Sequence, residues 1–442
     1  MGVLGLGYVG LVTAACLSSR GIRTFCYDVD VEKLRSLRRG LSPIFEPGLK
    51  EMIRDVVDSG TLIVTDSLDD VIRNTSIAFI TVGTPSSPDG QVDLSYIRAV
   101  SENIGAALRG RPDGYLVVVK STVPPGTTAG VIKPVIEGGS GRSCGRGFSL
   151  CVNPEFLREG NAVYDTLNPD RIVIGEVDPG SSRPLIELYT KFYGERRPPT
   201  LITNHVNAEL IKYTNNLFLA MRVSAINMIA NVCQRIPGAD VTVVAEGVGM
   251  DRRIGPHFLR AGLGWGGSCW PKDLRGLRYL ARSLNVEVPL IDATIEVNEQ
   301  QPLLAVKMAS EMLGTLRGKR VAVLGLSFKP GTDDIREATS LKLIRHLLES
   351  GATVVAYDPA AMENARRVLG NSITFARSPR DCLDGADCCI LVTEWEEFKS
   401  LTPLDFAGRM RFPLLIDGRR VYDPTVFSKG LRYVAVGLGP RE

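Results

Sequence analysis

Short apolar runs alternate with helical patterns along the first third of the chain. Turn residues follow each run, and one helical stretch covers about residues 10–19. Strands of a parallel sheet give such runs because both faces are buried, and a helix crosses between successive strands. We therefore predict a doubly wound parallel sheet. Its expected strands are residues 1–4, 24–27, 62–64, 77–82, 116–119 and 150–152.

The middle of the chain has a different pattern. From Ala208 to Val232, apolar residues recur at i, i+3 and i+4 without a proline, which predicts one long helix. Helical patterns continue to about Glu299. We expect this region to act as a spacer between two sheets and as a dimer interface.

A second α/β region begins at Lys319 and repeats the N-terminal order of strand, glycine turn, helix, strand and aspartate. The predicted fold is therefore α/β, with two Rossmann-like doubly wound parallel-sheet domains joined by a long central helix and a helical middle domain. The expected domains are residues 1–200, 201–300 and 301–442. The expected strands of the last domain are residues 321–324, 353–357, 388–392 and 414–416.

The bulk composition narrows the classes of function. The 442 residues are 44% hydrophobic and 23% charged, with a net charge of +3, as in a globular protein. No basic stripe is present, which argues against a nucleic-acid partner. No uninterrupted apolar run reaches the roughly 18 residues of a membrane span, and the N-terminus lacks a secretory pattern. We expect a cytoplasmic protein that does not contact a membrane.

Cysteine and histidine spacing does not indicate a metal. The nine cysteines form no C-x-x-C pair, and none of the three histidines is at ligand spacing. We therefore expect no metal site. Cys144 and Cys151 flank a short turn, so a disulfide between them and two free thiols are both open.

A glycine-rich turn follows the first predicted strand. Gly5-x-Gly7-x-x-Gly10 opens a helix, and Asp28 ends the second predicted strand. Such glycines bring a pyrophosphate onto the N-terminus of the helix. Asp28 can accept hydrogen bonds from the adenine ribose and would repel a 2′-phosphate. The pattern predicts NAD rather than NADP; the alternative is a glycine turn without a ligand.

A second glycine-rich stretch carries a cysteine. Residues 262–273 are Gly-Leu-Gly-Trp-Gly-Gly-Ser-Cys-Trp-Pro-Lys-Asp. Glycines allow close approach of the backbone to a ligand, and a thiol beside a cation such as Lys272 can act as a nucleophile. Together with a redox cofactor, Cys269 indicates an oxidation through a covalent thioester. The alternative is a buried structural cysteine.

Nine segments in order resemble one family, the UDP-glucose/GDP-mannose dehydrogenases. They are residues 5–11, 43–49, 82–85, 120–127, 153–160, 209–216, 266–273, 325–336 and 417–419. Members oxidise the C6 alcohol of a nucleotide sugar to a carboxylate with two NAD⁺. The segment Asn-Pro-Glu-Phe-Leu-Arg-Glu-Gly at residues 153–160 is most similar to the UDP-glucose 6-dehydrogenase branch.

The resemblance implies a four-electron oxidation of UDP-glucose to UDP-glucuronate by a homodimer that is joined through its central helices. Residues 1–200 would bind NAD, residues 201–300 would provide the dimer interface and the catalytic loop, and residues 301–442 would bind the UDP-sugar. Cys269 would form a thiohemiacetal and then a thioester. The other implied catalytic residues are Lys212 for oxyanions, Asn216 for a sugar hydroxyl, Asp273 for the C6 hydroxyl proton, Glu155 for the hydrolytic water, and Thr122 for the cofactor or water.

The resemblance also implies two sets of binding residues. Those for NAD are Gly5, Gly7, Tyr8, Val9, Gly10, Asp28, Lys33, Thr84, Ser121, Thr122, Glu159, Lys272 and Arg336. Those for the nucleotide sugar are Glu155, Phe156, Leu157, Arg158, Lys212, Asn216, Arg253, Phe258, Arg260, Gly266, Ser268, Phe328, Lys329 and Arg419. Arg253 would reach the site from the partner subunit.

Three alternatives stay open. The first is the same chemistry on UDP-galactose, a UDP-N-acetylhexosamine or GDP-mannose; Trp265 stands where family members commonly have another aromatic residue, which leaves the sugar preference open. The second is a two-electron hydroxyacid dehydrogenase, which would need neither the cysteine loop nor a second Rossmann-like domain. The third is a non-catalytic nucleotide-sugar-binding protein, although that class would be expected to lose Cys269, Lys212 or Asp273.

Overall fold

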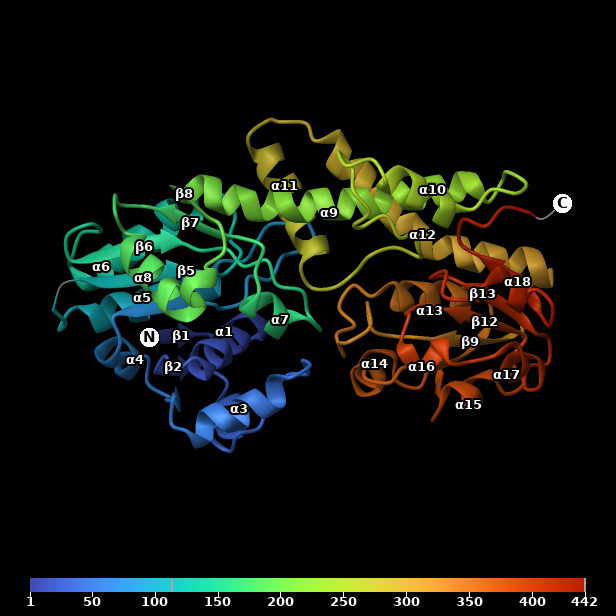
Figure 1. The fold of residues 1–442 in the computed structure, drawn as a ribbon, viewed down its shortest axis with the longest axis horizontal. Coiled ribbons are helices and arrows are strands. Elements are labelled where there is room, and N and C mark those ends of the chain that lie inside the picture. Colours follow the sequence, from blue (N-terminus) through green and yellow to red (C-terminus); the bar gives the residue numbers. More distant parts are fainter. Residues whose placement is uncertain (113, 441–442) are drawn as a thin grey trace. The chain divides into compact units, whose positions relative to one another are not determined.

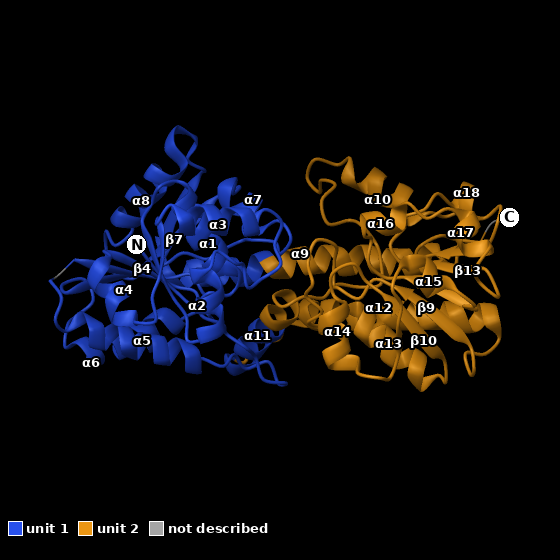
Figure 2. Ribbon diagram, turned by 90° about the horizontal axis from the view of Figure 1, so that it is seen from below, with its two compact units in different colours: residues 1–215, 275–284 blue, residues 216–274, 285–442 orange. Residues whose placement is uncertain are grey.

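The structure is a computed structural model that describes residues 1–112 and 114–440. The chain divides into two compact units (Figure 2), which are residues 1–215 with 275–284 and residues 216–274 with 285–442. Two helices, α9 (His205–Cys233) and α11 (Trp270–Ser283), each contribute residues to both units.

The first unit is built on a sheet with the strand order β3-β2-β1-β4-β5-β6-β7-β8. From β3 to β6 this is the 3-2-1-4-5-6 order of a Rossmann sheet, and these strands pair in parallel. β7 joins β6 antiparallel and pairs with β8 in parallel. The strands are β1 (Gly2–Leu4), β2 (Thr24–Tyr27), β3 (Leu62–Val64), β4 (Ile77–Ile80), β5 (Tyr115–Val119), β6 (Phe148–Val152), β7 (Ile172–Glu176) and β8 (Thr200–Asn204).

Helices cover both faces of this sheet (Figure 1). Val3 packs in one core with residues of α1, α3 and α8, whereas the next residue, Leu4, packs in a second core with residues of α4, α5 and α6. Successive side chains of a strand point to opposite faces, so the apolar run of β1 fills both cores. The helices are α1 (Tyr8–Ser19), α2 (Val31–Arg38), α3 (Leu49–Asp58), α4 (Leu68–Asn74), α5 (Ser95–Leu108), α6 (Lys133–Ser140), α7 (Ala162–Leu167) and α8 (Arg183–Tyr193), with a π-helical turn at Thr128–Ile132 and a 3₁₀ turn at Gly194–Arg196.

Helix α9 is long and apolar. By length and by a mean hydropathy of 1.3 it is the one helix of the described chain that would suffice to cross a membrane, which is weak evidence because core helices pass the same test. The sequence analysis predicted this helix but not a membrane span, because Lys212 and Arg222 interrupt its apolar run. Glu209 fixes its first turns, because its carboxylate accepts hydrogen bonds from Gly126 N and Thr128 Oγ1, both at 2.6 Å.

The second unit contains a sheet with the order β11-β10-β9-β12-β13-β14, which is again the 3-2-1-4-5-6 order, here with parallel pairing throughout the described strands. The strands are β9 (Arg320–Leu324), β10 (Thr353–Tyr357), β11 (Thr374–Phe375), β12 (Cys388–Leu391), β13 (Leu414–Asp417) and β14 (Arg432–Ala435). The helices are α10 (Val241–Gly249), α12 (Pro289–Leu313), α13 (Thr339–Glu349), α14 (Met362–Leu369), α15 (Pro379–Leu383), α16 (Glu396–Lys399), α17 (Pro403–Ala407) and α18 (Pro424–Phe427).

The predicted fold class is confirmed, with two Rossmann-like sheets and a long central helix. Each predicted strand corresponds to an observed one, to within a few residues at its ends. The sequence analysis missed β7, β8, β11 and β14, and the first sheet is parallel except for the antiparallel pair of β6 and β7. All nine cysteines are free, and Cys144 donates a hydrogen bond to Asp178 Oδ1 at 3.3 Å rather than pairing with Cys151.

Candidate active site

The glycine turn after β1 is shaped by backbone contacts. Gly5 has φ +100°, and a Cβ there would lie 2.9 Å from the carbonyl carbon of Thr81. A Cβ on Gly10 would lie 1.9 Å from the Gly5 oxygen, so neither position accepts a side chain. At Gly7 a Cβ would face open space, and α1 begins at the next residue without a side-chain cap. An uncapped helix N-terminus behind an open glycine fits a dinucleotide pyrophosphate.

Asp28 lies at the end of β2, beside this turn. Its carboxylate accepts hydrogen bonds from Leu6 N at 2.6 Å and from Asp30 N at 2.9 Å, and Lys33 Nζ lies 3.7 Å away. A carboxylate has about four lone-pair positions, so these bonds leave capacity for ribose hydroxyls. Tyr8 and Val9 start α1, and the Tyr8 hydroxyl donates to Phe45 O at 2.8 Å.

The loops after β4 and β5 are tied together. Thr84 Oγ1 donates to Thr122 O at 2.8 Å, and Ser121 Oγ donates to Val82 O at 2.7 Å. Both loops follow the carboxyl ends of neighbouring strands of the sheet. Ligands of open α/β sheets bind at this edge, so Thr84, Ser121 and Thr122 lie where the sequence analysis expects cofactor contacts.

A buried ion pair follows β6. Glu155 Oε1 lies 2.9 Å from Lys212 Nζ, and both side chains are buried. Glu155 Oε2 accepts a hydrogen bond from Leu157 N at 2.6 Å. Burial by itself would raise the pKa of Glu155. The charge of the Lys212 ammonium and the hydrogen bonds from Lys212 and from Leu157 N outweigh burial, so the pKa of Glu155 is lowered. The Glu155 carboxylate is therefore ionised at neutral pH.

A second buried lysine lies near this pair, and the sequence analysis missed it. Lys120 Nζ donates to Asn153 Oδ1 at 3.1 Å, and Tyr189 OH donates to the same oxygen. Burial lowers the pKa of Lys120 to about 8, opposed by the charge of Glu155 and assisted by that of Lys212. Its signal in the sequence is a lysine directly after the apolar strand β5, which ends at Val119, because a charged residue there is either exposed or part of a site.

The other predicted residues of this segment have partners of their own. The Arg171 guanidinium lies 3.8 Å from the centroid of the Phe156 ring, and Lys212 Nζ lies 5.6 Å from it. Arg158 makes a two-pronged ion pair with Asp165, with distances of 2.7 and 3.0 Å. Phe156 therefore packs beside the Glu155–Lys212 pair, whereas the Arg158 guanidinium is held on the exposed side of its loop. Glu159, the last predicted residue of this segment, is half-buried.

In the second unit, a polar cluster stands at the start of α11. Asp273 is buried and accepts hydrogen bonds from Asn216 Nδ2 and from Lys272 Nζ, both at 2.6 Å. Asp273 N donates to Cys269 O at 2.8 Å, which places Cys269 one residue before the helix. Its sulfur lies 3.5 Å from Ser268 Oγ. This unit thus brings Asn216 next to Asp273, which lies 57 positions later in the sequence and close to Ser268, Cys269 and Lys272.

The glycine loop before Cys269 needs its glycines. A Cβ on Gly266 would lie 2.3 Å from Glu337 O, and one on Gly267, at φ +89°, would lie 2.8 Å from the Phe328 ring. The Phe328 ring thus covers Gly267, and Lys329 Nζ lies 5.4 Å from the centroid of that ring.

Buried amides hold the same loop from behind. Asn298 bonds both to Trp265 N, at 2.7 Å, and to Trp265 O, at 3.0 Å. Asn227 Oδ1 accepts from Gly262 N at 2.8 Å, and Gln301 Nε2 donates to Gly262 O at 3.0 Å. The sequence analysis missed these three positioning residues. The feature that could have indicated them is an amide side chain within an otherwise apolar helix. Trp265 is buried, so its indole anchors the loop.

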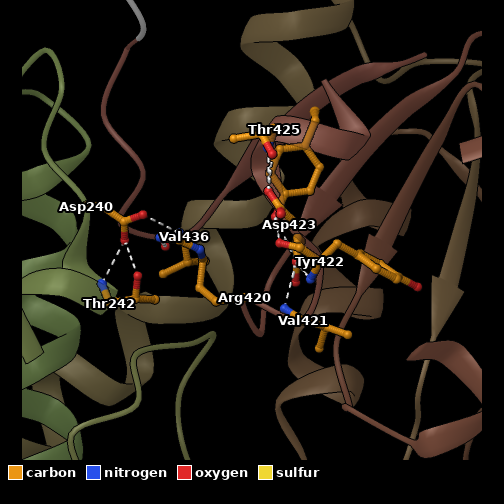
Figure 3. Close-up of polar contacts among 10 residues, drawn as sticks. Asp240, Thr242, Arg420, Val421, Tyr422, Asp423, Thr425 and Val436 are labelled. Carbon is orange, nitrogen blue, oxygen red and sulfur yellow. Dashed lines mark hydrogen bonds and ion pairs between the residues drawn. The ribbon is translucent and has the colours of Figure 1, made fainter. Parts of the chain in front are cut away.

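Arg419 is the best placed of the predicted substrate arginines. Its Nε donates to Val392 O at 2.6 Å, and its Nη1 lies 3.4 Å from Gly264 O, on the glycine loop. The next residue, Arg420, forms an ion pair with Asp240, beside Thr242 (Figure 3), at 2.7 Å.

The remaining candidates lie nearer the surface. Arg253 pairs with Asp251 and Arg336 pairs with Asp334, each through two nitrogens and across two residues, and both guanidinium groups are exposed. Phe258, at φ +61°, has its ring 5.9 Å from that of Trp270. Arg260 is exposed. Of these four side chains, that of Phe258 contacts Trp270, the residue that follows Cys269.

Metal-ligating residues do not cluster in the described chain, where no group of three or more His, Cys, Asp or Glu is placed to hold an ion.

Three family domains match the chain in order. They are the NAD binding domain, the central domain and the UDP binding domain of the UDP-glucose/GDP-mannose dehydrogenase family, over residues 1–193, 206–300 and 322–424. UDP-glucose 6-dehydrogenase AglM of Haloferax volcanii is 43% identical over 422 residues, which cover 95% of this chain and 96% of that protein. UDP-glucose 6-dehydrogenase TuaD of Bacillus subtilis is 41% identical over 437 residues, which cover 98% and 92%.

Solved structures of nucleotide-sugar dehydrogenases also resemble this chain. A UDP-glucose dehydrogenase of the hyperthermophilic archaeon Pyrobaculum islandicum superposes with a TM-score of 0.91 at 41% identity, covering 99% of this chain and 97% of that one. The UDP-D-ManNAc dehydrogenase of Pyrococcus horikoshii superposes with a TM-score of 0.87 at 28% identity.

Proposed function

The chain belongs to the UDP-glucose/GDP-mannose dehydrogenase family, and from this membership we propose that it oxidises UDP-glucose to UDP-glucuronate with NAD. The observation that carries the proposal is the cluster of Cys269, Asp273, Asn216 and Lys272 at the start of α11. For the reaction at the sugar C6 carbon, it supplies Cys269 as a nucleophile, Asp273 as a base, and Asn216 and Lys272 as hydrogen-bond donors. Relatives that are 41–43% identical over nearly the whole chain carry the name UDP-glucose 6-dehydrogenase, which supports the choice of sugar.

NAD, when bound, accepts one hydride from the C6 carbon in each of two oxidations. The residues that would hold it are the Gly5–Gly7–Gly10 turn, Asp28 and the loops of Thr84 and Ser121. In the first oxidation Asp273 receives the C6 hydroxyl proton, directly or through a water. The two hydrogen bonds to Asp273 orient its carboxylate, and Asn216 would exchange its bond to Asp273 for one to the sugar hydroxyl.

Cys269 carries the intermediate between the two oxidations. Its thiolate adds to the C6 aldehyde, and the resulting thiohemiacetal loses a hydride and a proton to become a thioester. The start of α11 favours negative charge at this position, because the helix dipole is positive there. Attack of water on the thioester then releases the carboxylate and restores the thiol. The aldehyde is thus never released between the two steps.

Glu155 and Lys212 serve the hydrolytic step. The ionised Glu155 carboxylate accepts a proton from the attacking water, and the Lys212 ammonium stabilises the oxyanion that forms on the former aldehyde oxygen. Thr122, in the loop after β5, orients the water or the cofactor. Lys212 and Asn216 are four residues apart on α9, so one helix supplies both a charge and a hydrogen-bonding group.

The remaining predicted residues are assigned to binding. We propose that residues 1–200 hold NAD, with Lys33, Glu159, Lys272 and Arg336 adding contacts. Residues 201–300 carry the catalytic loop, and residues 301–442 hold the UDP group. The sugar-nucleotide contacts are assigned to the predicted set that includes Phe258, Arg260, Ser268, Phe328, Lys329 and Arg419.

The same proposal includes a homodimer joined through the central helices. In the second unit, α9, α10 and the residue after α10 expose large apolar side chains, of which Val243 and Met250 are 65% and 75% exposed. Apolar patches of this kind mark association sites. The other members on these helices are Phe218, Met228, Val232, Val244 and Val248. The partner subunit would contribute Arg253 to the substrate phosphates.

We place the protein in the cytoplasm. Its nine cysteines are all free, and the proposed chemistry needs Cys269 as a reduced thiol.

A panel of nucleotide sugars tests the proposed substrate. We expect kcat/KM for UDP-glucose to exceed that for UDP-galactose, UDP-N-acetylglucosamine and GDP-mannose by at least about a hundredfold, since a hydrogen-bonding sugar site rejects an isomer strongly. NADH formation monitored at 340 nm, a standard wavelength, gives these rates. A higher value for another sugar would reassign the substrate, and ligand binding without NADH would favour a non-catalytic binding protein.

A further inference from the structure

The turn after β13 is unusually constrained. Asp417 is fully buried, and its two oxygens accept hydrogen bonds from Arg419 N at 3.0 Å, Val421 N at 2.8 Å, Tyr422 N at 3.0 Å and Tyr433 OH at 2.9 Å. Arg420, at the centre of the turn, has φ +54°, a left-handed conformation that disfavours a residue with a Cβ. Such strain persists where the surrounding structure enforces it, and it collects at functional sites.

The side chain of Arg420 is buried in spite of its charge. Its Nη2 pairs with Asp240 Oδ2 at 2.7 Å, and its Nη1 donates to Val436 O at 3.3 Å (Figure 3). Its Nε is buried and has no hydrogen-bond partner among the described residues. A left-handed backbone and an unsatisfied donor both cost free energy, so the fold does not keep an arginine here for stability alone.

Asp240 is a firm anchor for this arginine. It caps α10 by accepting a hydrogen bond from Thr242 N at 2.8 Å. The next residue, Val241, donates its N–H to Gly437 O at 2.9 Å. Burial opposes ionisation of Asp240, but Arg420 and Thr242 outweigh burial and lower its pKa. The ion pair therefore ties the turn to α10.

The two residues before Arg420 support the loop that leads to Cys269. A Cβ on Gly418 would lie 2.5 Å from Leu263, and a Cβ on Gly262 would lie 2.8 Å from Arg419 Nη1. Arg419 Nη1 also lies 3.4 Å from Gly264 O. The backbone of the turn thus packs against the Leu263 side chain, and the Arg419 side chain packs against Gly262 at the start of the glycine loop. A shift of the turn moves the loop, and the loop ends at the nucleophile.

We propose that Arg420 is a positioning residue whose ion pair with Asp240 holds Arg419 and the residue 262–264 backbone in place, so that Cys269 and the Arg419 guanidinium keep their reactive geometry. Arg420 itself touches no substrate. The proposal rests on the proposed function for its kinetic consequences, although the position of the loop is independent of which sugar is used. Displacement of a nucleophile by about 1 Å costs on the order of a hundredfold in rate.

Arg420→Gly is the sharpest test, because glycine accepts φ +54° and removes only the side chain. We expect kcat with UDP-glucose to fall at least tenfold and KM to rise at least threefold. Iodoacetamide alkylation of Cys269 in the substrate-free enzyme, followed by peptide mass spectrometry, is expected to change in rate at least threefold. Arg420→Lys keeps the charge and should bring kcat, KM and the alkylation rate part of the way back to the wild-type values. Asp240→Asn breaks the same pair from the other side and should reproduce them.

The matched control is Arg409→Gln, which removes an exposed ion pair with Asp384 (2.9 Å) in the same unit and should leave kcat, KM and alkylation unchanged. Wild-type values of all three quantities in Arg420→Gly and Asp240→Asn would overturn the proposal. The proposal would also be overturned if the loss of activity in these variants were fully explained by a smaller fraction of folded enzyme. The alkylation rate tests the role of Arg420 independently of the proposed substrate. If UDP-glucose is not the substrate, kcat and KM cannot be measured with it, but the alkylation rate of Cys269 still shows whether Arg420 positions the loop.

Discussion

Two buried lysines of the first unit act on the charge of the Glu155 carboxylate. Lys212 contacts its carboxylate directly, whereas Lys120 interacts with it only through space and bonds to Asn153. In the described chain, the Lys120 ammonium has no carboxylate within ion-pair distance. Two lysines and one carboxylate leave this cluster with a net positive charge, which suits the oxyanion of thioester hydrolysis.

Lys120 therefore gives a pH-dependent prediction. Its pKa is about 8 in the folded protein and near the ordinary 10.5 when unfolded, so the unfolded state binds more protons between these values. The contribution of Lys120 to stability thus improves as pH rises from 8 to 10.5. Relative to Lys120→Met, the free energy of unfolding of the wild type should increase over this window by on the order of 3 kcal/mol.

Urea unfolding at pH 7, 8, 9 and 10 measures this difference. Lys307→Met, at an exposed position on α12, is the control and should track the wild type at every pH. Parallel curves for the wild type and Lys120→Met would show that Lys120 keeps an ordinary pKa.

Cys269 gives a second prediction at the same scale. Cys269→Ser should lower the rate of UDP-glucuronate formation at least about a thousandfold, because an alcohol at neutral pH is a far weaker nucleophile than a thiolate. The thiol is only partly buried, so the melting temperature should stay within a few degrees. Steady-state assays with product analysis check the first expectation. Full turnover in this variant would exclude covalent catalysis.

At the scale of elements, the two sheets use the same construction. Gly5 and Gly325 follow the first strand of each sheet, at φ +100° and +101°. Each sheet then has an aspartate after its second strand, and its carboxylate accepts a hydrogen bond from the residue after the glycine: Asp28 from Leu6 N at 2.6 Å and Asp358 from Leu326 N at 2.7 Å. Each turn is thus fixed before any ligand binds.

The glycine loop gives the prediction at this scale. In Gly266→Ala the new Cβ would meet the backbone oxygen of Glu337 at 2.3 Å, so the loop must move. We expect a loss of roughly 1–3 kcal/mol in stability and at least a tenfold loss in kcat. Gly138→Ala is the control, since a Cβ there faces open space within α6 and should stabilise the helix by up to about 1 kcal/mol. Equal behaviour of the two variants in thermal unfolding and kinetics would contradict this view of the loop.

Elements with a strong period were predictable from the sequence. The buried strands and α9 were found because their apolar residues recur regularly. β8 was missed because Leu201 and Ile202 are exposed, so pairing with β7 rather than its own pattern specifies it. The cysteine loop was recognised from its motif. The support that Asn298 and Arg419 give this loop was not, because both contacts join residues far apart in the chain.

At the scale of the whole molecule, self-association is the structural prediction. Val232→Asp with Val243→Asp places two charges on the apolar face of α9 and α10, where burial of an unpaired charge is costly. We expect the wild type to sediment as a dimer at micromolar concentration and this variant as a monomer. Leu404→Asp, on α17 at 81% exposure, should remain a dimer. Identical sedimentation of the wild type and the double variant would remove these helices as the interface.

The central claim is that one enzyme carries a nucleotide sugar through two oxidations on Cys269. The most direct measurement is the number of NADH formed per UDP-glucose consumed when the sugar is limiting. The account predicts two NADH and one UDP-glucuronate, with no aldehyde in solution. One NADH per sugar, with a released aldehyde, would contradict it.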